Sequence, residues 1–265
     1  MHRIGHGKRP GDEAEAQRLS SLFHHDGGTQ RTYQRMIQQM DLQIGRILHA
    51  LDANGATENT IVIFTSDNGG ERYSDTWPFT GRKTELLEGG LRVPAIIRWP
   101  GHILPGMVSE QVTISMDWFP TLLGAAGTAP DPRYPSDGID LLPWLMRGAE
   151  PERRKLFWRY KSNNQQAARD GDWKYLKIRD NTFLFDAVQD PLERANLKDR
   201  HKGVYDRLVA EWEEWNSSML PLDPQSFTAG FTGAELADHF GVEGAVDVNG
   251  PGSPPQGSVG GSLLK

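Results

Sequence analysis

The sequence predicts an α/β fold followed by a smaller antiparallel sheet. Between residues 29 and 51, apolar residues recur at the three- and four-residue spacing of an amphipathic helix, and Asn54-Gly55 closes it. A continuous β-branched run follows at 60–65, which is typical of a strand buried on both faces of a parallel sheet. From about residue 155 the pattern changes to short strand candidates separated by turns. Helix followed by buried strand is the observation that indicates α/β architecture.

The remaining elements are predicted in order along the chain. A second strand is expected at 95–97 and a helix at 115–126, where Pro120 lies in the first part and Gly127 follows the end. A short helix is expected at 140–146. The strand candidates of the second part are 156–160, 166–169, 173–178 and 182–186. The last amphipathic helix carries Val204, Leu208, Trp212 and Trp215.

Composition excludes several function classes. Among the 265 residues, Lys and Arg number 29 and Asp and Glu 35, so the net charge of -6 offers no basic field, and we expect no nucleic-acid partner. The chain has no Cys, hence no disulfide, thiolate metal site or Cys nucleophile. No apolar run approaches the roughly 20 residues of a membrane span, so none is expected. Residues 1–10 lack the apolar region of a signal peptide, and the compartment stays open.

Polar residues follow the first predicted strand, where ligands bind in open α/β sheets. Asp67 and Asn68 offer the hard oxygen ligands that Ca²⁺ or Mg²⁺ accepts, although Asp-Asn-Gly is also a common plain turn. Lys83 is a compact cation that can reach an anionic oxygen, and its alternative is a solvated surface group. Glu88, before Gly89-Gly90, is either a ligand or a residue that shapes the loop.

The order of the motifs is more specific than any one of them. Along the chain stand TIVIFTSDNGG, GRKTELLEGGLRVPAIIRWPG, ISMDWFPTLLGAAG, SDGIDLLPWL, ARDGDWKYL, LFD and DPLERANL. In this order, from Tyr33 to about Trp215, the sequence resembles the sulfatase family. The resemblance implies an α/β fold that is part of an alkaline-phosphatase-like sandwich, with a smaller C-terminal antiparallel-sheet subdomain. It implies hydrolysis of sulfate monoesters, which are small-molecule or carbohydrate sulfate esters.

The same resemblance implies the roles of the candidate residues. Asp67 and Asn68 match the family's second pair of ligands for one divalent cation, usually Ca²⁺, with Mg²⁺ as the alternative. Lys83 matches the lysine that contacts the sulfate group, and it is therefore both the catalytic and the substrate-binding candidate. Glu88 is expected to shape the loop. In the family the cation lies beside a formylglycine nucleophile, and the loops 73–79 and 159–164 are expected at the pocket mouth.

Part of the family's machinery has no counterpart in this sequence. The nucleophile motif, Cys or Ser followed by x-Pro-x-Arg, is absent, and so is the early pair of metal-binding aspartates. His2, His6, His24 and His25 stand in no convincing motif, so we assign no catalytic histidine. We therefore expect the C-terminal part of a sulfatase, with a missing N-terminal half and little activity on its own.

The predicted organisation follows from these matches. It comprises an irregular N-terminal segment (1–28), the C-terminal part of the catalytic α/β domain (29–148), a C-terminal subdomain (149–220) and a low-complexity tail (221–265). Two other readings stay open. One is a non-catalytic sulfatase-like protein, or a half that needs a partner chain. The other keeps the fold but hydrolyses phosphoesters or phosphonates, because relatives of sulfatases do so at similar sites.

Overall fold

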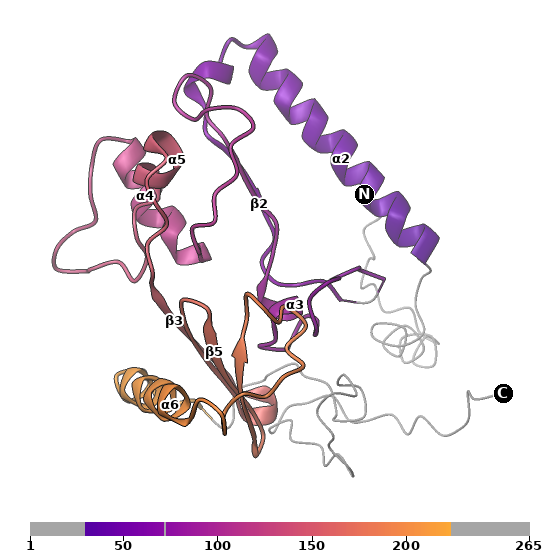
Figure 1. The fold of residues 1–265 in the computed structure, drawn as a ribbon. Coiled ribbons are helices and arrows are strands. Elements are labelled where there is room, and N and C mark those ends of the chain that lie inside the picture. Colours follow the sequence, from indigo (N-terminus) through magenta and orange to yellow (C-terminus); the bar gives the residue numbers. More distant parts are fainter. Residues whose placement is uncertain (1–29, 72, 224–265) are drawn as a thin grey trace, which may run out of the picture. The chain divides into compact units, whose positions relative to one another are not determined.

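A computed structural model describes residues 30–71 and 73–223 of the chain. The described residues divide into two compact units, of which one takes in 30–50 and 73–74 and the other 51–71 and 75–223. Most of helix α2 (Gln30–Ala53) belongs to the first unit, and it confirms the predicted amphipathic helix (Figure 1). The short helix considered at 14–23 and the tail from 224 onward lie outside the described residues, and the predicted domain boundaries stay predictions.

The first sheet differs from the prediction in its direction. Strands β1 (Val62–Thr65) and β2 (Ala95–Arg98) lie where they were predicted, but they pair antiparallel, with Val62 opposite Arg98. The expected parallel, doubly buried strand is therefore wrong for the described part of the chain. A continuous apolar run indicates burial but carries no information about the direction of the neighbouring strand. Here the partner of β1 is the next strand along the chain.

The antiparallel register fixes where the intervening segment lies. Thr65, at the end of β1, is opposite Ala95, at the start of β2, so residues 66–94 leave and re-enter the sheet at one end. This segment includes the four-residue helix α3 (Glu88–Leu91), which the sequence presented as a loop. Asp67, Asn68 and Lys83, the site residues that the sequence predicts, therefore all lie in this one connecting segment. We call residues 66–94 the 66–94 excursion, because the chain leaves the two-stranded sheet and returns to the same end of it.

Three short helical elements follow β2 along the chain. They are η3 (Ser115–Asp117), α4 (Trp118–Ala125) and α5 (Leu142–Arg147). The first two together confirm the predicted helix at 115–126, and the third confirms the predicted short helix near 140–146. Pro120 lies in the first turn of α4, where a missing backbone N–H costs no hydrogen bond.

A buried ion pair explains two of the sequence motifs in this region. Asp117 is fully buried, and Arg154 donates to both of its carboxylate oxygens, at 2.6 and 3.0 Å. The same carboxylate accepts the backbone N–H groups of Ile114 and Ile139, at 2.8 and 3.0 Å. Asp117 thus joins the ISMDWFP motif to the SDGID motif and to the chain entering the second sheet.

The second sheet has four antiparallel strands in sequence order. They are β3 (Lys155–Tyr160), β4 (Gln165–Asp170), β5 (Trp173–Ile178) and β6 (Asn181–Asp186). Between β3 and β4 lies the short turn η4 (Ser162–Asn164), and Thr57–Asn59 forms a similar turn, η2, before β1. Helix α6 (Lys202–Ser217) follows the sheet. All four strands and the helix confirm the predicted C-terminal subdomain elements.

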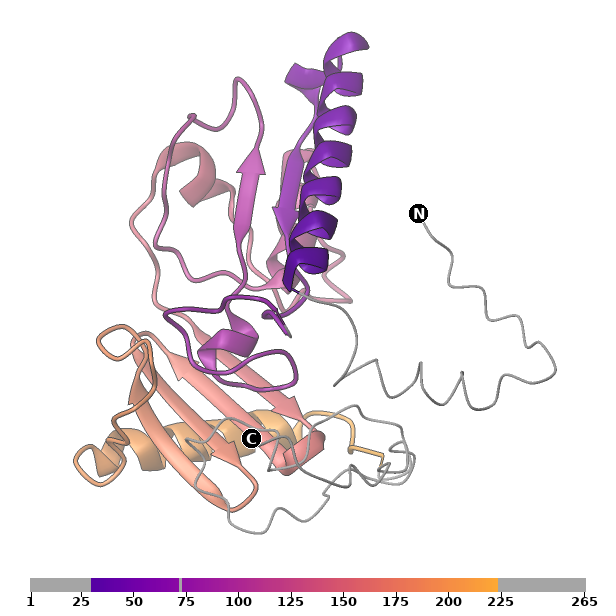
Figure 2. The same ribbon diagram turned by 90° about the vertical axis from the view of Figure 1, so that its right-hand side faces the viewer.

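The four-stranded sheet is covered on both faces. On one face Leu184 and Tyr175 pack against Leu208 and Trp212 of α6. On the other face Leu176, with Ala167, Ile178 and Phe185, packs against Leu86 and Leu87 of the 66–94 excursion. Figures 1 and 2 show α6 and α3 on opposite sides of the strands. Because alternate strand residues point to opposite faces, one sheet supplies both cores, and it carries the site-bearing segment directly.

Candidate functional site

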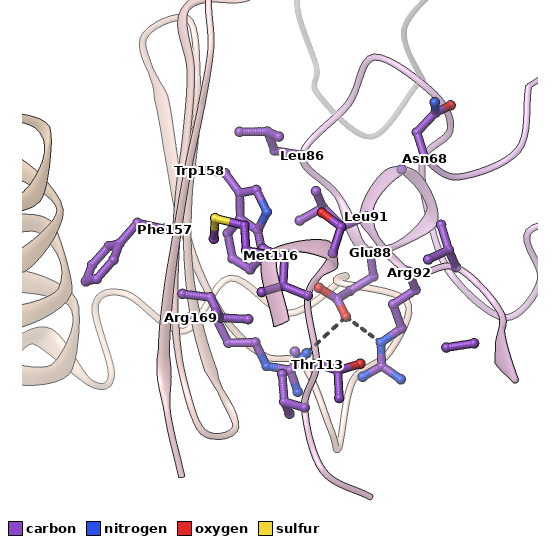
Figure 3. Close-up of a pocket in the computed structure, with 18 of the residues that line it drawn as sticks. Asn68, Leu86, Glu88, Leu91, Arg92, Thr113, Met116, Phe157, Trp158 and Arg169 are labelled. Carbon is purple, nitrogen blue, oxygen red and sulfur yellow. Dashed lines mark hydrogen bonds and ion pairs between the residues drawn. The ribbon is translucent and has the colours of Figure 1, made fainter. Parts of the chain in front are cut away.

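A cavity of about 1480 Å³ lies beside the end of β1. Asp67, Asn68 and Lys83 all line it, so the structure brings the three sequence-predicted site residues to one cavity. Figure 3 labels Asn68 among the residues around it. Arg159 and Tyr160, from the loop predicted at the pocket mouth, also line it, and their contact with a substrate stays a prediction.

The turn after β1 presents oxygen atoms to this cavity. Asp67 is exposed, and among the described residues its carboxylate has one hydrogen bond, accepted from the Ser66 hydroxyl at the long distance of 3.5 Å. The Ser66 hydroxyl also lies 3.0 Å from the Asn68 carbonyl oxygen, which fixes the turn. A weakly engaged carboxylate next to an amide side chain fits part of a Ca²⁺ or Mg²⁺ site.

Further oxygen ligands, from the protein, from water or from a substrate, would have to join this pair, because Ca²⁺ takes six to eight oxygen atoms. Over 30–71 and 73–223 the structure has no group of three or more His, Asp and Glu residues placed to hold a metal ion. Asp67 and Asn68 by themselves therefore do not form a complete site for such an ion.

Lys83 lies on the return half of the excursion. Its backbone N–H donates to the Gly70 carbonyl at 2.8 Å, which ties it to the turn that carries Asp67 and Asn68. Its ammonium nitrogen is 3.9 Å from Glu71, and the side chain is 47% exposed. The ion pair is long and solvated, so it contributes little to holding Lys83 in place. The ammonium therefore remains able to bind an anion in the cavity.

Glycines allow the two halves of the excursion to meet backbone to backbone. Gly69 N–H donates to the Gly90 carbonyl at 2.9 Å, and a Cβ atom on Gly69 would overlap the carbonyl oxygen of Gly89. A Cβ atom on Gly89 would in turn overlap the carbonyl oxygen of Gly81. Only residues without a side chain permit this approach. Gly69 and Gly89 are thus needed to place the turn against α3.

Glu88 has a role that the sequence did not predict. Its side chain is 3% exposed, and one oxygen accepts the Lys174 ammonium at 2.8 Å. The other accepts Arg92 at 2.7 Å and lies 3.4 Å from Arg169, and Figure 3 shows the two guanidinium groups approaching from different sides. Glu193 completes the cluster through an ion pair with Lys174 at 2.8 Å. Glu88 shapes the loop, as predicted, but does so through buried charge.

The electrostatics of this cluster differ between its two carboxylates. Burial by itself raises the pKa of Glu88, but the positive charges of Lys174, Arg169 and Arg92 outweigh it and lower that pKa to about 2. Burial, together with the neighbouring Glu88 charge, raises the pKa of Glu193 despite the ion pair. For Lys174, burial lowers the pKa, but the two carboxylates outweigh it and raise that pKa. The bridge between Glu88 and Lys174 thus joins ionised partners at neutral pH.

Lys174 was missed, although the strand pattern contained a signal for it. In β5 the residues at 174, 176 and 178 point to one face of the sheet. Leu176 and Ile178 belong to the buried core of that face, so Lys174 takes the place of a buried apolar residue. A lysine on the apolar face of a strand indicates a buried partner of opposite charge. Glu193, in a turn after the sheet, offered no comparable pattern.

Two family profiles match the sequence over most of the described chain. The profile described as Sulfatase matches residues 6–128, and the one described as N-sulphoglucosamine sulphohydrolase, C-terminal, matches residues 81–217. The first covers the turn, Lys83 and α4, and the second continues through the four-stranded sheet and α6. Among the described residues, no helix is both long and apolar enough to cross a membrane.

Characterised relatives match over part of their length. N-acetylgalactosamine-6-sulfatase of Mus musculus is 39% identical over 148 residues, which are 54% of this chain and 28% of that protein. Steryl-sulfatase of Mus musculus is 30% identical over 239 residues, covering 73% of this chain and 38% of that protein. The chain thus spans about a third of the length of these relatives.

Solved structures agree with these matches. The structure of Ps i-CgsB in complex with a neocarrahexaose has a TM-score of 0.65 at 27% identity, and covers 75% of this chain and 46% of its own. That of BT4656 with its substrate D-glucosamine-2-N,6-O-disulfate has a TM-score of 0.56 at 26% identity, covering 78% and 46%. A phosphonate monoester hydrolase from Silicibacter pomeroyi has a TM-score of 0.50 at 25% identity, covering 68% and 39%. By profile, sequence and structure, this chain belongs to the sulfatase family, with its alkaline-phosphatase-like fold.

Proposed function

We propose that this chain supplies the sulfate-binding lysine and two of the metal ligands of a sulfuric ester hydrolase. The observation that carries the proposal is the common cavity: Lys83 lines it together with Asp67 and Asn68. The hydrogen bond from the Lys83 backbone N–H to the Gly70 carbonyl links Lys83 to the turn that carries Asp67 and Asn68. The proposal concerns the active site of the protein to which this chain contributes, because the chain spans only part of its relatives.

Lys83 is proposed to bind an oxygen of the sulfate group. The sulfuryl group carries negative charge in the ester and in the released sulfate, so a fixed cation beside it is useful throughout hydrolysis. The side chain is 47% exposed, and within 30–71 and 73–223 its one ion pair is the long one with Glu71. A bound sulfate oxygen can therefore replace water around the ammonium without breaking a close ion pair.

Asp67 and Asn68 are proposed to hold one divalent cation, Ca²⁺ or Mg²⁺, through a carboxylate and an amide oxygen. Such a cation supplies Lewis-acid polarisation of the sulfate oxygens when it is bound. The chain's own contribution is the placement of these two side chains on a turn that β1, Ser66 and the glycine contacts hold. The exposed carboxylate of Asp67 supports this role, because it has no strong competing partner among the described residues.

The substrate class is proposed to be sulfated carbohydrates. Two of the relatives support this choice by name, since one is an N-acetylgalactosamine-6-sulfatase and another was solved with a disulfated glucosamine as its substrate. A second, non-carbohydrate possibility comes from the similarity to steryl-sulfatase.

The binding of inorganic sulfate tests the role of Lys83. Titration of the purified chain is compared with that of Lys83→Ala and of Lys155→Ala, which is a matched control because its side chain is 45% exposed and pairs with one carboxylate outside the cavity. Losing a charge-assisted hydrogen bond costs about 1.5–3 kcal/mol, so we expect at least tenfold weaker binding for Lys83→Ala alone. Equal affinities in all three proteins would reject the assignment.

A phosphonate or phosphate monoester hydrolase is the alternative that one observation favours, namely the similarity to the Silicibacter pomeroyi enzyme. Competition at pH 8 between sulfate, phosphate and methylphosphonate separates the two functions. Preference for either phosphorus anion would favour the alternative.

A further inference from the structure

The ion cluster under α3 contains a lysine that water does not reach. Lys174 of β5 is 0% exposed, and its ammonium nitrogen lies 2.8 Å from carboxylate oxygens of both Glu88 and Glu193. Glu193 also accepts the backbone N–H of Glu88, at 2.7 Å, through its other oxygen. Three segments that are distant in sequence are thus joined at one buried point. Burying an ammonium is unfavourable unless it is paired in this way.

A second buried side chain connects the same sheet to the residue next to Lys83. Gln165 of β4 is 2% exposed, and its amide group donates to the Thr84 carbonyl at 2.8 Å. Its oxygen accepts the Leu86 N–H at 2.9 Å. The Gln165 side chain thus satisfies one backbone carbonyl and one backbone N–H of this stretch, as a neighbouring strand would. Lys174 and Gln165 together hold the segment 81–91 at Thr84, Leu86 and Glu88.

The segment 81–91 in turn determines where the site residues lie. Lys83 precedes Thr84, which Gln165 holds, and the Lys83 N–H is bound to Gly70. At the other end, the Gly90 carbonyl accepts the Gly69 N–H, next to Asn68. No room remains between these backbones for an intervening side chain. A displacement of the segment would therefore move Lys83 and the turn of Asp67 together.

We propose that Lys174 is a positioning residue, which holds the segment 81–91 through Glu88 and Glu193 and so fixes where Lys83 and the turn after β1 lie relative to the four-stranded sheet. Gln165 is the second, uncharged support of the same segment. The inference rests on the proposed function for the role of Lys83, but the restraint on the segment is independent of any ligand. Buried ion pairs serve conformational specificity in some proteins rather than net stability, and this one has its partners on the site segment itself.

Amide hydrogen exchange distinguishes positioning from a general contribution to the core. Lys174→Met is compared with the unmodified chain and with Lys177→Met, a control on the same strand whose side chain points to the other face and is only partly buried. We expect exchange in 81–91 to become at least tenfold faster in Lys174→Met, while β6 and α6 exchange at the unmodified rate. Lys177→Met should leave exchange unchanged both in 81–91 and in β6 and α6.

Sulfate affinity is measured on the same proteins, with Lys174→Met expected to bind at least threefold more weakly. Faster exchange throughout β3–β6 and α6, or unchanged exchange in 81–91, would overturn the positioning role. If Lys174→Met does not fold, Gln165→Met decides, since it adds no buried charge: the same localised acceleration supports the inference and none overturns it. If no protein in the set binds sulfate, the proposed function fails while the exchange data still decide the positioning role.

Discussion

The two sheets of this chain differ in how their strands are buried. In the four-stranded sheet, Ala167, Leu176 and Leu184 are all 0% exposed, because α6 covers one face and the 81–91 segment covers the other. In the two-stranded sheet β1 has no fully buried residue and Ile96 of β2 is 61% exposed. The described core is therefore concentrated in the C-terminal sheet.

The difference shows how a site can depend on a distant sheet. Asp67, Asn68 and Lys83 lie beside the poorly buried pair β1–β2, but the segment that joins them packs on the four-stranded sheet. Loops carry chemistry, and a rigid scaffold places it. Here the scaffold is not the sheet from which the site loop starts, since buried residues of β4 and β5 hold that loop.

The largest expected effect follows from the unequal burial. Leu176→Ala should lower the free energy of unfolding by about 2–5 kcal/mol, because it removes a fully buried side chain from the core. Ile96→Ala should lower it by less than about 1 kcal/mol, since most of that side chain is already exposed. Urea unfolding of the two variants measures both changes. Equal losses would mean that both sheets share the described core.

The next effect, of similar or smaller size, is the dependence of the free energy of unfolding on pH. The pKa of Glu88 is lowered to about 2 from its ordinary value of 4.5, so its contribution is complete above pH 4.5 and is lost as the pH falls toward 2. The shift corresponds to about 3 kcal/mol. The contribution of Glu193 to stability changes with pH in the opposite direction. Because its pKa is raised in the folded state, protonation of Glu193 favours the folded state as the pH falls.

Urea unfolding from pH 7 to pH 3 measures this dependence. Glu88→Gln should be less stable than the unmodified chain at pH 7, and the gap should narrow steadily below pH 4.5. Glu214→Gln, on the exposed surface of α6, is the control and should follow the unmodified chain at every pH. A constant gap for Glu88→Gln would show that its carboxylate is not held ionised by the cluster.

The smallest expected effect concerns the metal. Ca²⁺ at millimolar concentration should stabilise this chain by about 1 kcal/mol or less, because two side-chain ligands give weak binding. Asp67→Ala should abolish the increase, while Asp75→Ala, on the same excursion but outside the residues that line the cavity, should retain it. Thermal unfolding with and without Ca²⁺ measures the effect. A calcium response that survives Asp67→Ala would remove Asp67 as a ligand.

Local pattern was sufficient for most of the elements, and the order of motifs along the chain was sufficient for the candidate residues. The apolar spacing of α2 and α6, the β-branched run of β1 and the turns between β3 and β6 each depend on neighbours within a few residues. Asp67, Asn68 and Lys83 were likewise found from the order of motifs, and the structure brings them to one cavity. Information of this kind is carried by short stretches of chain.

Packing between distant segments decided the rest. The antiparallel direction of β1 and β2 depends on how residues 66–94 return to the sheet, which no run of apolar residues encodes. The pairing of Glu88 with Lys174, 86 positions away, arises because both charges are excluded from water at the same place. Burial and long-range charge pairing are properties of the assembled fold, so only the tertiary structure could reveal that the C-terminal sheet holds the site segment.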